Sequence, residues 1–107
     1  MVTFEEFKKL EIKVAQIKDV QDHPNADKLY VITIDLGDQT KQIVAGIRLA
    51  YPDKNELLGK KIAVIDNLEP AILRGVESQA MLLAASDENG ISLIVPEKEV
   101  KIGSVIK

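Results

Sequence analysis

Residues 67–85 read NLEPAILRGVESQAMLLAA, a polar segment that begins with a proline turn and ends in an apolar strand. Pro70 fixes one backbone angle and stops the strand before it, while Gly75 permits a backbone conformation that residues with side chains rarely adopt. These two residues predict a tight, well-defined loop that exposes Arg74. We expect the rest of the chain to form a scaffold that presents this loop.

Two interpretations of the loop are open. In the first, the planar guanidinium of Arg74 binds a phosphate or a base edge, and Ser78 and Gln79 supply neutral donors beside it. In the second, Arg74 pairs with Glu69 or Glu77, and the segment is an ordinary connection. Loops carry function more often than strands do, yet most loops carry none, so the residues by themselves favour the second interpretation.

Composition limits the class of protein. The chain has 107 residues, of which 46% are apolar and 29% charged, and this is typical of one globular domain that spans residues 1–107. It has no cysteine, which excludes disulfides and thiolate metal sites. No apolar run approaches the roughly 20 residues that span a bilayer, and no signal-peptide pattern opens the chain. We therefore expect a cytoplasmic protein without membrane contact.

The net charge of −3 argues against a protein that binds nucleic acid through a broad basic face. The only adjacent basic pairs are Lys8-Lys9 and Lys60-Lys61, and the other cations are scattered. Any phosphate site must therefore be assembled by folding. Lys13, Lys18 and Lys41 alternate with apolar strand positions, which indicates a solvated face or, on a small barrel, a binding groove.

The first quarter of the chain changes its apolar period. Thr3 and Glu6 form a capping box ahead of an apolar edge at helical spacing, so a short N-terminal helix is expected. From residue 11 the period is two, and a phase slip at Ala15-Gln16 predicts a bulge that bends this first strand around a barrel corner. The strand ends at a cluster of turn residues, 22–27.

Alternating and β-branched patterns predict further strands at 29–36, 41–45, 61–66, 80–85 and 91–95. Pro52 and Gly59 bracket a short helical turn, 51–58, between the third and fourth strands. Five or six short strands with one helical connection match the order of an all-β OB-fold, a five-stranded Greek-key barrel, although another small barrel would give the same pattern. The apolar residues 100–106 are left over, and we expect them to cover a strand edge or to pair with another subunit.

The sequence offers no catalytic machinery. The carboxylates are dispersed, no nucleophile has a base at a recognisable spacing, and no glycine loop is suited to cradle a phosphate. His23 is the only histidine, and in a chain without cysteines it is interpreted as a turn residue rather than a metal ligand. We therefore expect no enzyme activity, no metal and no cofactor.

Three motifs, in this order along the chain, carry a resemblance to a known family. Residues 23–29 read HPNADKL, residues 44–47 read VAGI, and residues 67–85 are the segment quoted above. Together they resemble the tRNA-binding OB domain, which occurs in methionyl-tRNA synthetases as a C-terminal domain or a beta subunit, and also as a stand-alone structure-specific tRNA-binding protein. The resemblance covers nearly the whole chain, from residue 7 to residue 105.

The resemblance implies a non-catalytic module that recognises the folded shape of tRNA. It also implies a homodimer joined through a C-terminal β extension, about residues 91–107, and a role beside the catalytic chain of methionyl-tRNA synthetase. There a second binding site, in cis or in trans, increases tRNA capture. Lys28 and Arg74 would contact phosphates, Ser78 would donate a hydrogen bond, and Met81 would offer an apolar contact. The implied tRNA-binding residues are Asn25, Lys28, Arg74, Ser78 and Met81.

The chain departs from the family at two positions. Ile72 stands where relatives commonly have a lysine or arginine, which should weaken phosphate attraction, and Ala80 stands where many have glycine, which should narrow the approach of a ligand. Asn25 has an alternative role as a stabiliser of its own turn.

Two other functions remain open. The first is a dimeric peptide-binding export chaperone of the same fold, and the second is a domain that docks into a synthetase complex and binds RNA weakly. Salt separates RNA binding from peptide capture, since RNA binding falls steeply with salt and apolar capture does not.

Overall fold

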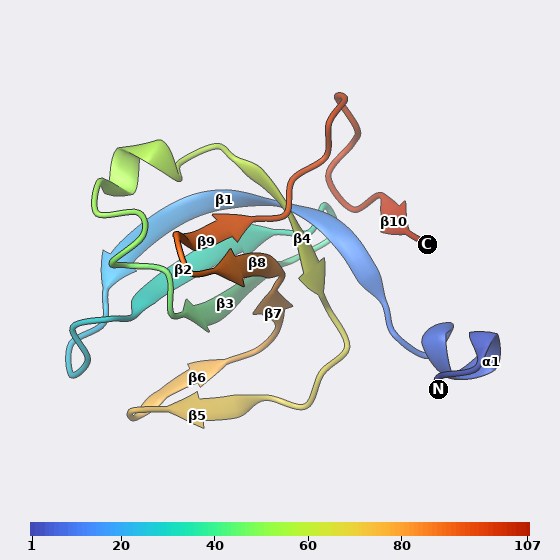
Figure 1. Cartoon of the computed structure of the whole chain (residues 1–107), viewed down its shortest axis with the longest axis horizontal. Coiled ribbons are helices and arrows are strands. Elements are labelled where there is room, and N and C mark those ends of the chain that lie inside the picture. Colours follow the sequence, from blue (N-terminus) through green and yellow to red (C-terminus); the bar gives the residue numbers. More distant parts are fainter.

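The computed structural model, which describes all 107 residues, is organised around one long strand, β1 (Ile12–Asp22). Its first half pairs with β4 (Lys61–Ile65) and its second half with β2 (Tyr30–Asp35), both antiparallel (Figure 1). The register shifts between Ile17 and Asp19, and a bulge of this kind bends a strand. β1 therefore serves two sides of the barrel, as expected.

The bulge lies further along the chain than predicted, because the phase slip at Ala15-Gln16 has another cause. Ala15 and Ile17 belong to the barrel core, whereas Val14 lines a hollow on the outer face together with C-terminal residues. Two buried faces therefore overlap in the sequence pattern of this strand. The bulge itself follows only after Ile17.

The remaining strands of the main sheet are β3 (Thr40–Ala45), β7 (Met81–Leu82) and β10 (Val105–Ile106). The strand order is β3-β2-β1-β4-β7, with β10 added to β1. A cluster of 15 buried, almost entirely aliphatic residues fills the barrel. A 3-10 helix, η1 (Lys54–Glu56), connects β3 to β4 and is shorter than the predicted helical turn. The expected all-β OB-fold with a short N-terminal helix is confirmed.

Side chains close the barrel between β3 and the chain just before β7. The Ser78 hydroxyl accepts the Val44 N–H at 3.0 Å and donates to the Ala80 carbonyl at 2.9 Å. The Gln79 Oε1 accepts the Gln42 N–H at 2.9 Å, and the Gln79 N–H donates to the Gln42 carbonyl at 2.8 Å. These bonds satisfy backbone groups of an edge strand that has no regular ladder partner there.

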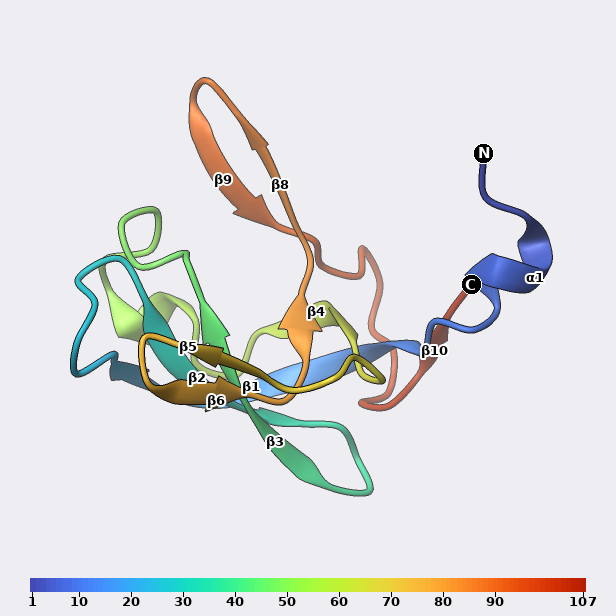
Figure 2. The same ribbon diagram turned by 90° about the horizontal axis from the view of Figure 1, so that it is seen from below.

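The predicted strand 80–85 is interrupted. β7 ends at Leu82, the Leu83 N–H donates to the Ala63 carbonyl at 2.9 Å, and the chain then leaves the barrel. It continues as β8 (Ala84–Asp87), which pairs with β9 (Gly90–Leu93) in a separate hairpin. Figure 2 shows this hairpin projecting away from the main sheet. The prediction was wrong here because one apolar run supplies two strands of different sheets.

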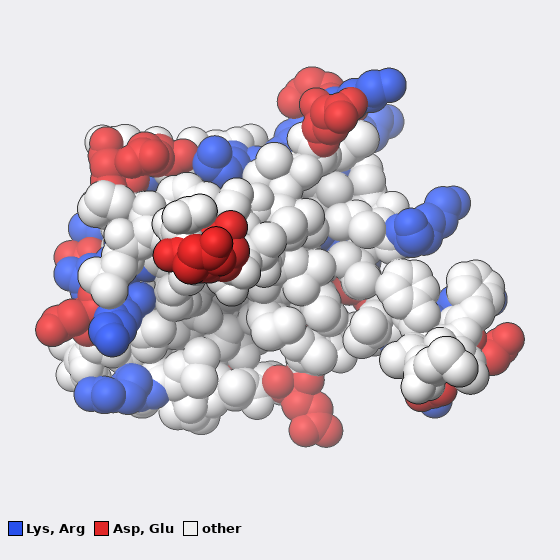
Figure 3. All heavy atoms as spheres, viewed as in Figure 1, with Lys and Arg blue, Asp and Glu red and all other residues white.

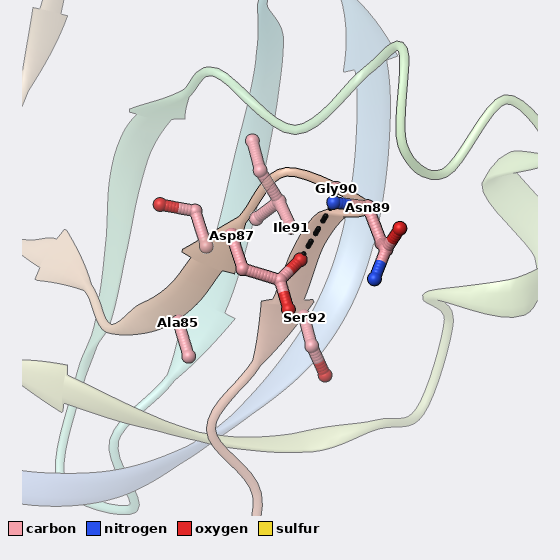
Figure 4. Close-up of a pocket in the computed structure, with 7 residues that line it drawn as sticks. Ala85, Asp87, Asn89, Gly90, Ile91 and Ser92 are labelled. Carbon is pink, nitrogen blue, oxygen red and sulfur yellow. Dashed lines mark hydrogen bonds between the residues drawn. The ribbon is translucent and has the colours of Figure 1, made fainter.

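A surface hollow of about 450 Å³ lies on this projecting hairpin and is lined by residues 85–92 except Glu88. Figure 4 shows the close-up, in which the Asn89 N–H donates to the Asp87 carboxylate at 2.8 Å and closes the turn. Asp87 is the only charged residue that lines the hollow. The hollow therefore has no cation for a phosphate.

The N-terminal helix α1 (Phe4–Phe7) has the predicted capping box, in which the Thr3 hydroxyl accepts the Glu6 N–H at 3.1 Å. The helix buries none of its residues and stands at one end of the molecule (Figure 1). The Asn67 side chain anchors the segment after it, because it accepts the Glu11 N–H and donates to the Lys9 carbonyl. Neither α1 nor η1 has the length or apolar character needed to cross a membrane.

The C-terminal segment folds back on β1 of the same chain. Val105 in β10 is in register with Lys13, and the Gly103 N–H donates to the Val14 carbonyl at 2.7 Å. Gly103 has a φ of +88°, and a Cβ there would lie 2.8 Å from the Leu36 carbonyl oxygen, so only glycine fits without a shift. The leftover apolar residues therefore cover a strand edge, which was the first of the two expectations.

Candidate nucleic-acid interface

The loop that the sequence singled out is a β-hairpin. β5 (Ala71–Leu73) pairs with β6 (Val76–Ser78), and Arg74 and Gly75 form the two-residue turn between them. Both turn residues have a positive φ, +52° for Arg74 and +90° for Gly75, which is the type I′ pattern that suits the twist of a hairpin. The tight, defined loop with an exposed Arg74 is confirmed, although the two short strands beside it were not predicted.

Arg74 is the only residue other than glycine with a positive φ. A side chain in the left-handed region destabilises the backbone by about 1–2 kcal/mol, and asparagine or glycine is the usual residue in such a turn. The guanidinium therefore occupies the tip at a small energetic cost to the fold. This backbone strain makes Arg74 a candidate functional residue.

The turn after β1 contacts this hairpin through His23 and Arg74. The His23 Nδ1 accepts the Asn25 N–H at 2.9 Å, so the ring proton is on Nε2, which lies 2.9 Å from the Leu73 carbonyl oxygen and donates to it. Arg74 Nη2 donates to the Asn25 carbonyl at 3.2 Å. His23 is buried, its bond from the Asn25 N–H caps the turn as expected, and its bond to the Leu73 carbonyl joins the two loops.

These two loops are the connections between barrel strands one and two and between barrel strands four and five. In OB-folds the corresponding loops, together with the face of strands two and three, bind oligonucleotides. Figure 1 shows both loops at the same end of the molecule, opposite α1. The predicted site thus lies where this architecture commonly places a nucleic-acid ligand.

The structure brings three of the five predicted site residues together at this end. Asn25 and Lys28 are exposed on the 22–29 turn, and Arg74 bonds to the Asn25 carbonyl. Neither Glu69 nor Glu77 forms an ion pair with Arg74, so the interpretation in which they neutralise it is wrong. The one hydrogen-bond partner of the Arg74 side chain is a neutral carbonyl, so no carboxylate of the chain competes with a ligand for the guanidinium.

The other two predicted residues lie on the barrel rather than at the hairpin tip. Ser78 is buried, and its hydroxyl already serves the Val44 N–H and the Ala80 carbonyl, so its position supports the hairpin rather than a ligand. Met81 is 47% exposed in β7, where it is in register with Ile65.

The two departures from the family pattern fall in different environments. Ile72 is 66% exposed on the hairpin, two residues from Arg74, so the missing cation there is a change at the surface. Ala80 is buried in the core cluster, so an alanine there does not narrow the approach of a ligand.

Lys13 and Lys41 do not form a free basic face, because both bind one buried carboxylate. Lys41 Nζ lies 2.6 Å and Lys13 Nζ 2.9 Å from the Asp66 oxygens, and Lys41 also donates to the Asp66 carbonyl. Burial opposes ionisation of Asp66, but the hydrogen bonds from Lys41 and then Lys13 outweigh it and hold the pKa of Asp66 below its usual value. The hydrogen bond between Lys13 and Asp66 raises the pKa of Lys13, although burial acts to lower it. Asp66 was not singled out in the sequence.

Figure 3 shows the charge on one face of the molecule. Lys and Arg side chains gather at the end where the β5–β6 turn and the segments after β1 and β3 meet, with Asp and Glu side chains among them. No group of three or more His, Asp and Glu side chains is placed to hold a metal ion. This cationic end is local, since the chain as a whole has a net charge of −3 and acidic side chains lie among the basic ones even here.

Comparisons with known proteins agree with this geometry. The family model described as "Putative tRNA binding domain" matches residues 12–105. The methionine–tRNA ligases of Thermococcus onnurineus and Pyrococcus furiosus are 54% and 50% identical over 106 residues, and the match covers 99% of this chain but 14% of each relative. The chain therefore spans about a seventh of the length of these curated relatives.

Solved structures share the whole fold. A MetRS-related protein from Pyrococcus horikoshii superposes with a TM-score of 0.91 at 35% identity, covering 100% of this chain and 98% of that one. A CsaA chaperone protein from Picrophilus torridus superposes with a TM-score of 0.90 at 31% identity, covering both chains fully. The family match spans the barrel and both loops of the interface, and the chain belongs to the tRNA-binding domain family.

Proposed function

We propose that this chain is the tRNA-binding module of a methionyl-tRNA synthetase and that it holds folded tRNA at the joined loops 22–29 and 71–78. The observation that carries the proposal is Arg74, a charged side chain in a left-handed turn, with no acidic partner and a bond to Asn25. The module acts in the cytoplasm and has no catalytic activity, metal or cofactor of its own.

The chemistry of binding follows from the rigid placement of a few donors. Arg74 and Lys28 contact phosphates. The Asn25 amide lies beside the β5–β6 turn, since its Nδ2 would be 3.9 Å from a Cβ added to Gly75, and it donates to a phosphate or ribose oxygen. Such contacts carry no base sequence. Because His23 fixes the two loops to each other, their donors recognise the spacing of phosphates in a folded RNA rather than its nucleotide sequence.

We expect tRNA capture to rise when this module accompanies the catalytic chain of a synthetase, in cis or in trans. A second binding site raises the local concentration of tRNA and leaves the chemical step unchanged. Steady-state charging can be compared between a synthetase that lacks the module and the same synthetase fused to this chain. The fusion should have a lower KM for tRNA and an equal kcat. The fusion that carries Arg74→Ala is the matched control and should lose most of the gain. An unchanged KM would contradict the capture role.

The chaperone alternative is favoured by one observation, the similarity to the CsaA chaperone protein. An apolar hollow of about 290 Å³, lined by Val14, Val95 and Val105 among others, offers such a protein a place for an apolar peptide. Competition separates the two functions, because tRNA held by cations is released as salt rises and an apolar peptide is not. A third function is docking into a synthetase complex with weak RNA binding, and in that case the chain should bind neither tRNA nor an apolar peptide tightly.

We further propose that residues 1–107 form one OB unit and that two copies associate through the C-terminal extension, about residues 91–107. Ile94, Val95 and Val105 are 44%, 48% and 69% exposed and border the apolar hollow. Exposed apolar residues gathered at a hollow mark an interaction surface more often than residues scattered singly do. β10 covers the edge of β1 in the same chain, so the interface uses its outer side chains rather than exchanged strands.

Val105→Asp should convert the dimer to a monomer, because it places a carboxylate in the apolar interface. The free energy of unfolding should change by no more than about 1 kcal/mol, because the Val105 side chain is exposed on a two-residue strand. Sedimentation velocity at micromolar concentration measures the change, with Glu77→Gln, exposed on the β5–β6 hairpin away from β10, as control (Figure 1). A wild-type chain that sediments as a monomer at that concentration would rule out the dimer.

A further inference from the structure

We propose that Arg48 and Lys54 form a second phosphate contact beside the 22–29 turn, an inference that rests on the proposed tRNA-binding function. Neither residue was singled out in the sequence. Arg48 directly follows the 44–47 motif, and Lys54 begins η1. The chain between β3 and β4 therefore brings a third segment to the cationic end of the molecule (Figure 1).

Arg48 holds the same turn as Arg74 and does so one residue further along. Its Nη1 donates to the Ala26 carbonyl at 3.4 Å, whereas Arg74 donates to the Asn25 carbonyl. Its guanidinium carbon lies 5.9 Å from the centre of the Tyr30 ring. Two arginines from two different loops thus bind consecutive carbonyls of one turn, and the same turn carries the exposed Lys28.

The Arg48 guanidinium is loosely held by its partners. Its Nη2 lies 3.4 Å from the Asp22 carboxylate, longer than the roughly 2.7–2.9 Å of a strong charge-assisted hydrogen bond. Only two of its nitrogen atoms have a partner, so further N–H groups remain available. The buried Tyr30 ring beside it is fixed by a 2.7 Å hydrogen bond from its hydroxyl to the Tyr51 carbonyl. The guanidinium therefore lies on a rigid base with donors to spare.

Asp22 is shared between two cations. Its second oxygen lies 3.0 Å from Lys54 Nζ, and both side chains are accessible to water, Asp22 at 48% and Lys54 at 41%. Exposed ion pairs of this kind contribute little to stability, so a phosphate can replace Asp22 as the partner of either cation. Asp22, Arg48 and Lys54 line one surface hollow. Asp27 also lines it and reduces its positive charge, but Asp27 forms no ion pair with either cation.

The hollow has a volume of about 390 Å³ and includes an apolar surface for a ribose or base. Leu49 is 69% exposed beside Arg48, as Ile72 is 66% exposed near Arg74. Each arginine of the cationic end thus has an exposed aliphatic neighbour. A backbone segment of RNA that reaches both arginines would place a phosphate at each and a sugar against each neighbour.

The test is a titration of the full chain with folded tRNA at two salt concentrations, for the wild type and four variants. We expect Arg48→Gln to weaken binding about fivefold to tenfold and to reduce the salt dependence of log K by roughly 0.7–0.9, as expected for one lost phosphate contact. Arg48→Lys should keep most of the affinity. Asp22→Asn should tighten binding by a few fold, because it frees two cations and removes a repulsive charge. Lys9→Gln, at the far end of the molecule, should bind like the wild type.

The Asp22→Asn result separates a binding role from a structural one. If Arg48 only clips the turn in place, removing its carboxylate partner should weaken tRNA binding or leave it unchanged, and either result overturns the proposal. An Arg48→Gln variant that unfolds at the wild-type temperature and binds tRNA with wild-type affinity and salt dependence also overturns it. A wild-type chain that binds no tRNA at all, and captures an apolar peptide or a protein instead, overturns the proposed function itself and is distinguishable from both results.

Discussion

Arg74→Ala should lower the affinity for folded tRNA by about tenfold to a hundredfold, the effect of removing a hydrogen-bonded charge worth roughly 1.5–3 kcal/mol. Arg74 has no acidic partner and its hydrogen bond within the fold is to the neutral Asn25 carbonyl, so the substitution removes a charge that no ion pair uses. The salt dependence of log K should fall by roughly 0.7–0.9 for the lost phosphate contact. Fluorescence or filter-binding titrations at two salt concentrations measure both quantities.

Arg74→Asn is the sharper variant, because asparagine suits the left-handed turn better than arginine does. We expect it to stabilise the protein by a few tenths of a kcal/mol, up to about 1 kcal/mol, while it loses tRNA affinity as the alanine variant does. Arg74→Lys keeps the charge without the planar guanidinium, so its tRNA affinity should lie between those of the wild type and the asparagine variant. Asparagine and wild-type proteins that bind tRNA equally well would show that Arg74 is only a turn residue.

Asp66→Ala should destabilise the fold by about 3 kcal/mol, the lower end of the range for breaking a buried ion pair. The Asp66 side chain is 7% exposed, and its removal leaves Lys13 and Lys41 without their shared counter-charge. The lower end applies because both lysines are about one-fifth exposed and reach water. Urea unfolding at pH 7 measures the loss, and Asp66→Asn, which keeps the shape, should lose less than Asp66→Ala.

The contribution of Asp66 to stability should depend on pH in a defined direction. Its pKa is lower in the folded protein than the ordinary 3.8, so its contribution is fully present above pH 3.8 and is lost as the pH falls through the folded pKa. The pKa of Lys13 is raised above 10.5, so its contribution is lost only as the pH rises through that higher value. The stability difference between the wild type and Asp66→Asn should be constant from pH 5 to 9 and should shrink below about pH 3.8. A difference that persists unchanged to pH 2 would contradict the ion-pair origin.

Local patterns predicted the elements but not the contacts between them. The capping box at Thr3, the long first strand and the exposed Arg74 all depend on residues that are neighbours in the sequence, and each is present. The interruption at Leu83 was missed, because it depends on a hydrogen bond to Ala63 in another strand. An apolar run gives no sign that it divides between two sheets.

The same limit applies to the site. Ser78 was predicted as a donor to a ligand; in the fold its hydroxyl donates to the Ala80 carbonyl and accepts the Val44 N–H, which is 34 residues away in the sequence. Lys41 was expected on a solvated face or in a binding groove, and its pairing with Asp66 was missed because the two residues are 25 positions apart in the sequence. Arg48 follows a recognised motif directly, and its position there was the one signal available. Charge scattered along the sequence indicates that a site must be assembled by folding, but the folded structure is needed to identify its members.

The first measurement to make is a titration of the wild-type chain with folded tRNA, with the same tRNA after heat denaturation, and with a short apolar peptide, each at two salt concentrations. Tighter binding to the folded tRNA, lost as salt rises, is the expected result, because the donors of the joined loops are fixed at a spacing that a folded backbone matches. Equal affinity for folded and denatured tRNA would contradict shape recognition. Salt-independent binding of the peptide alone would assign the protein to the chaperone function instead.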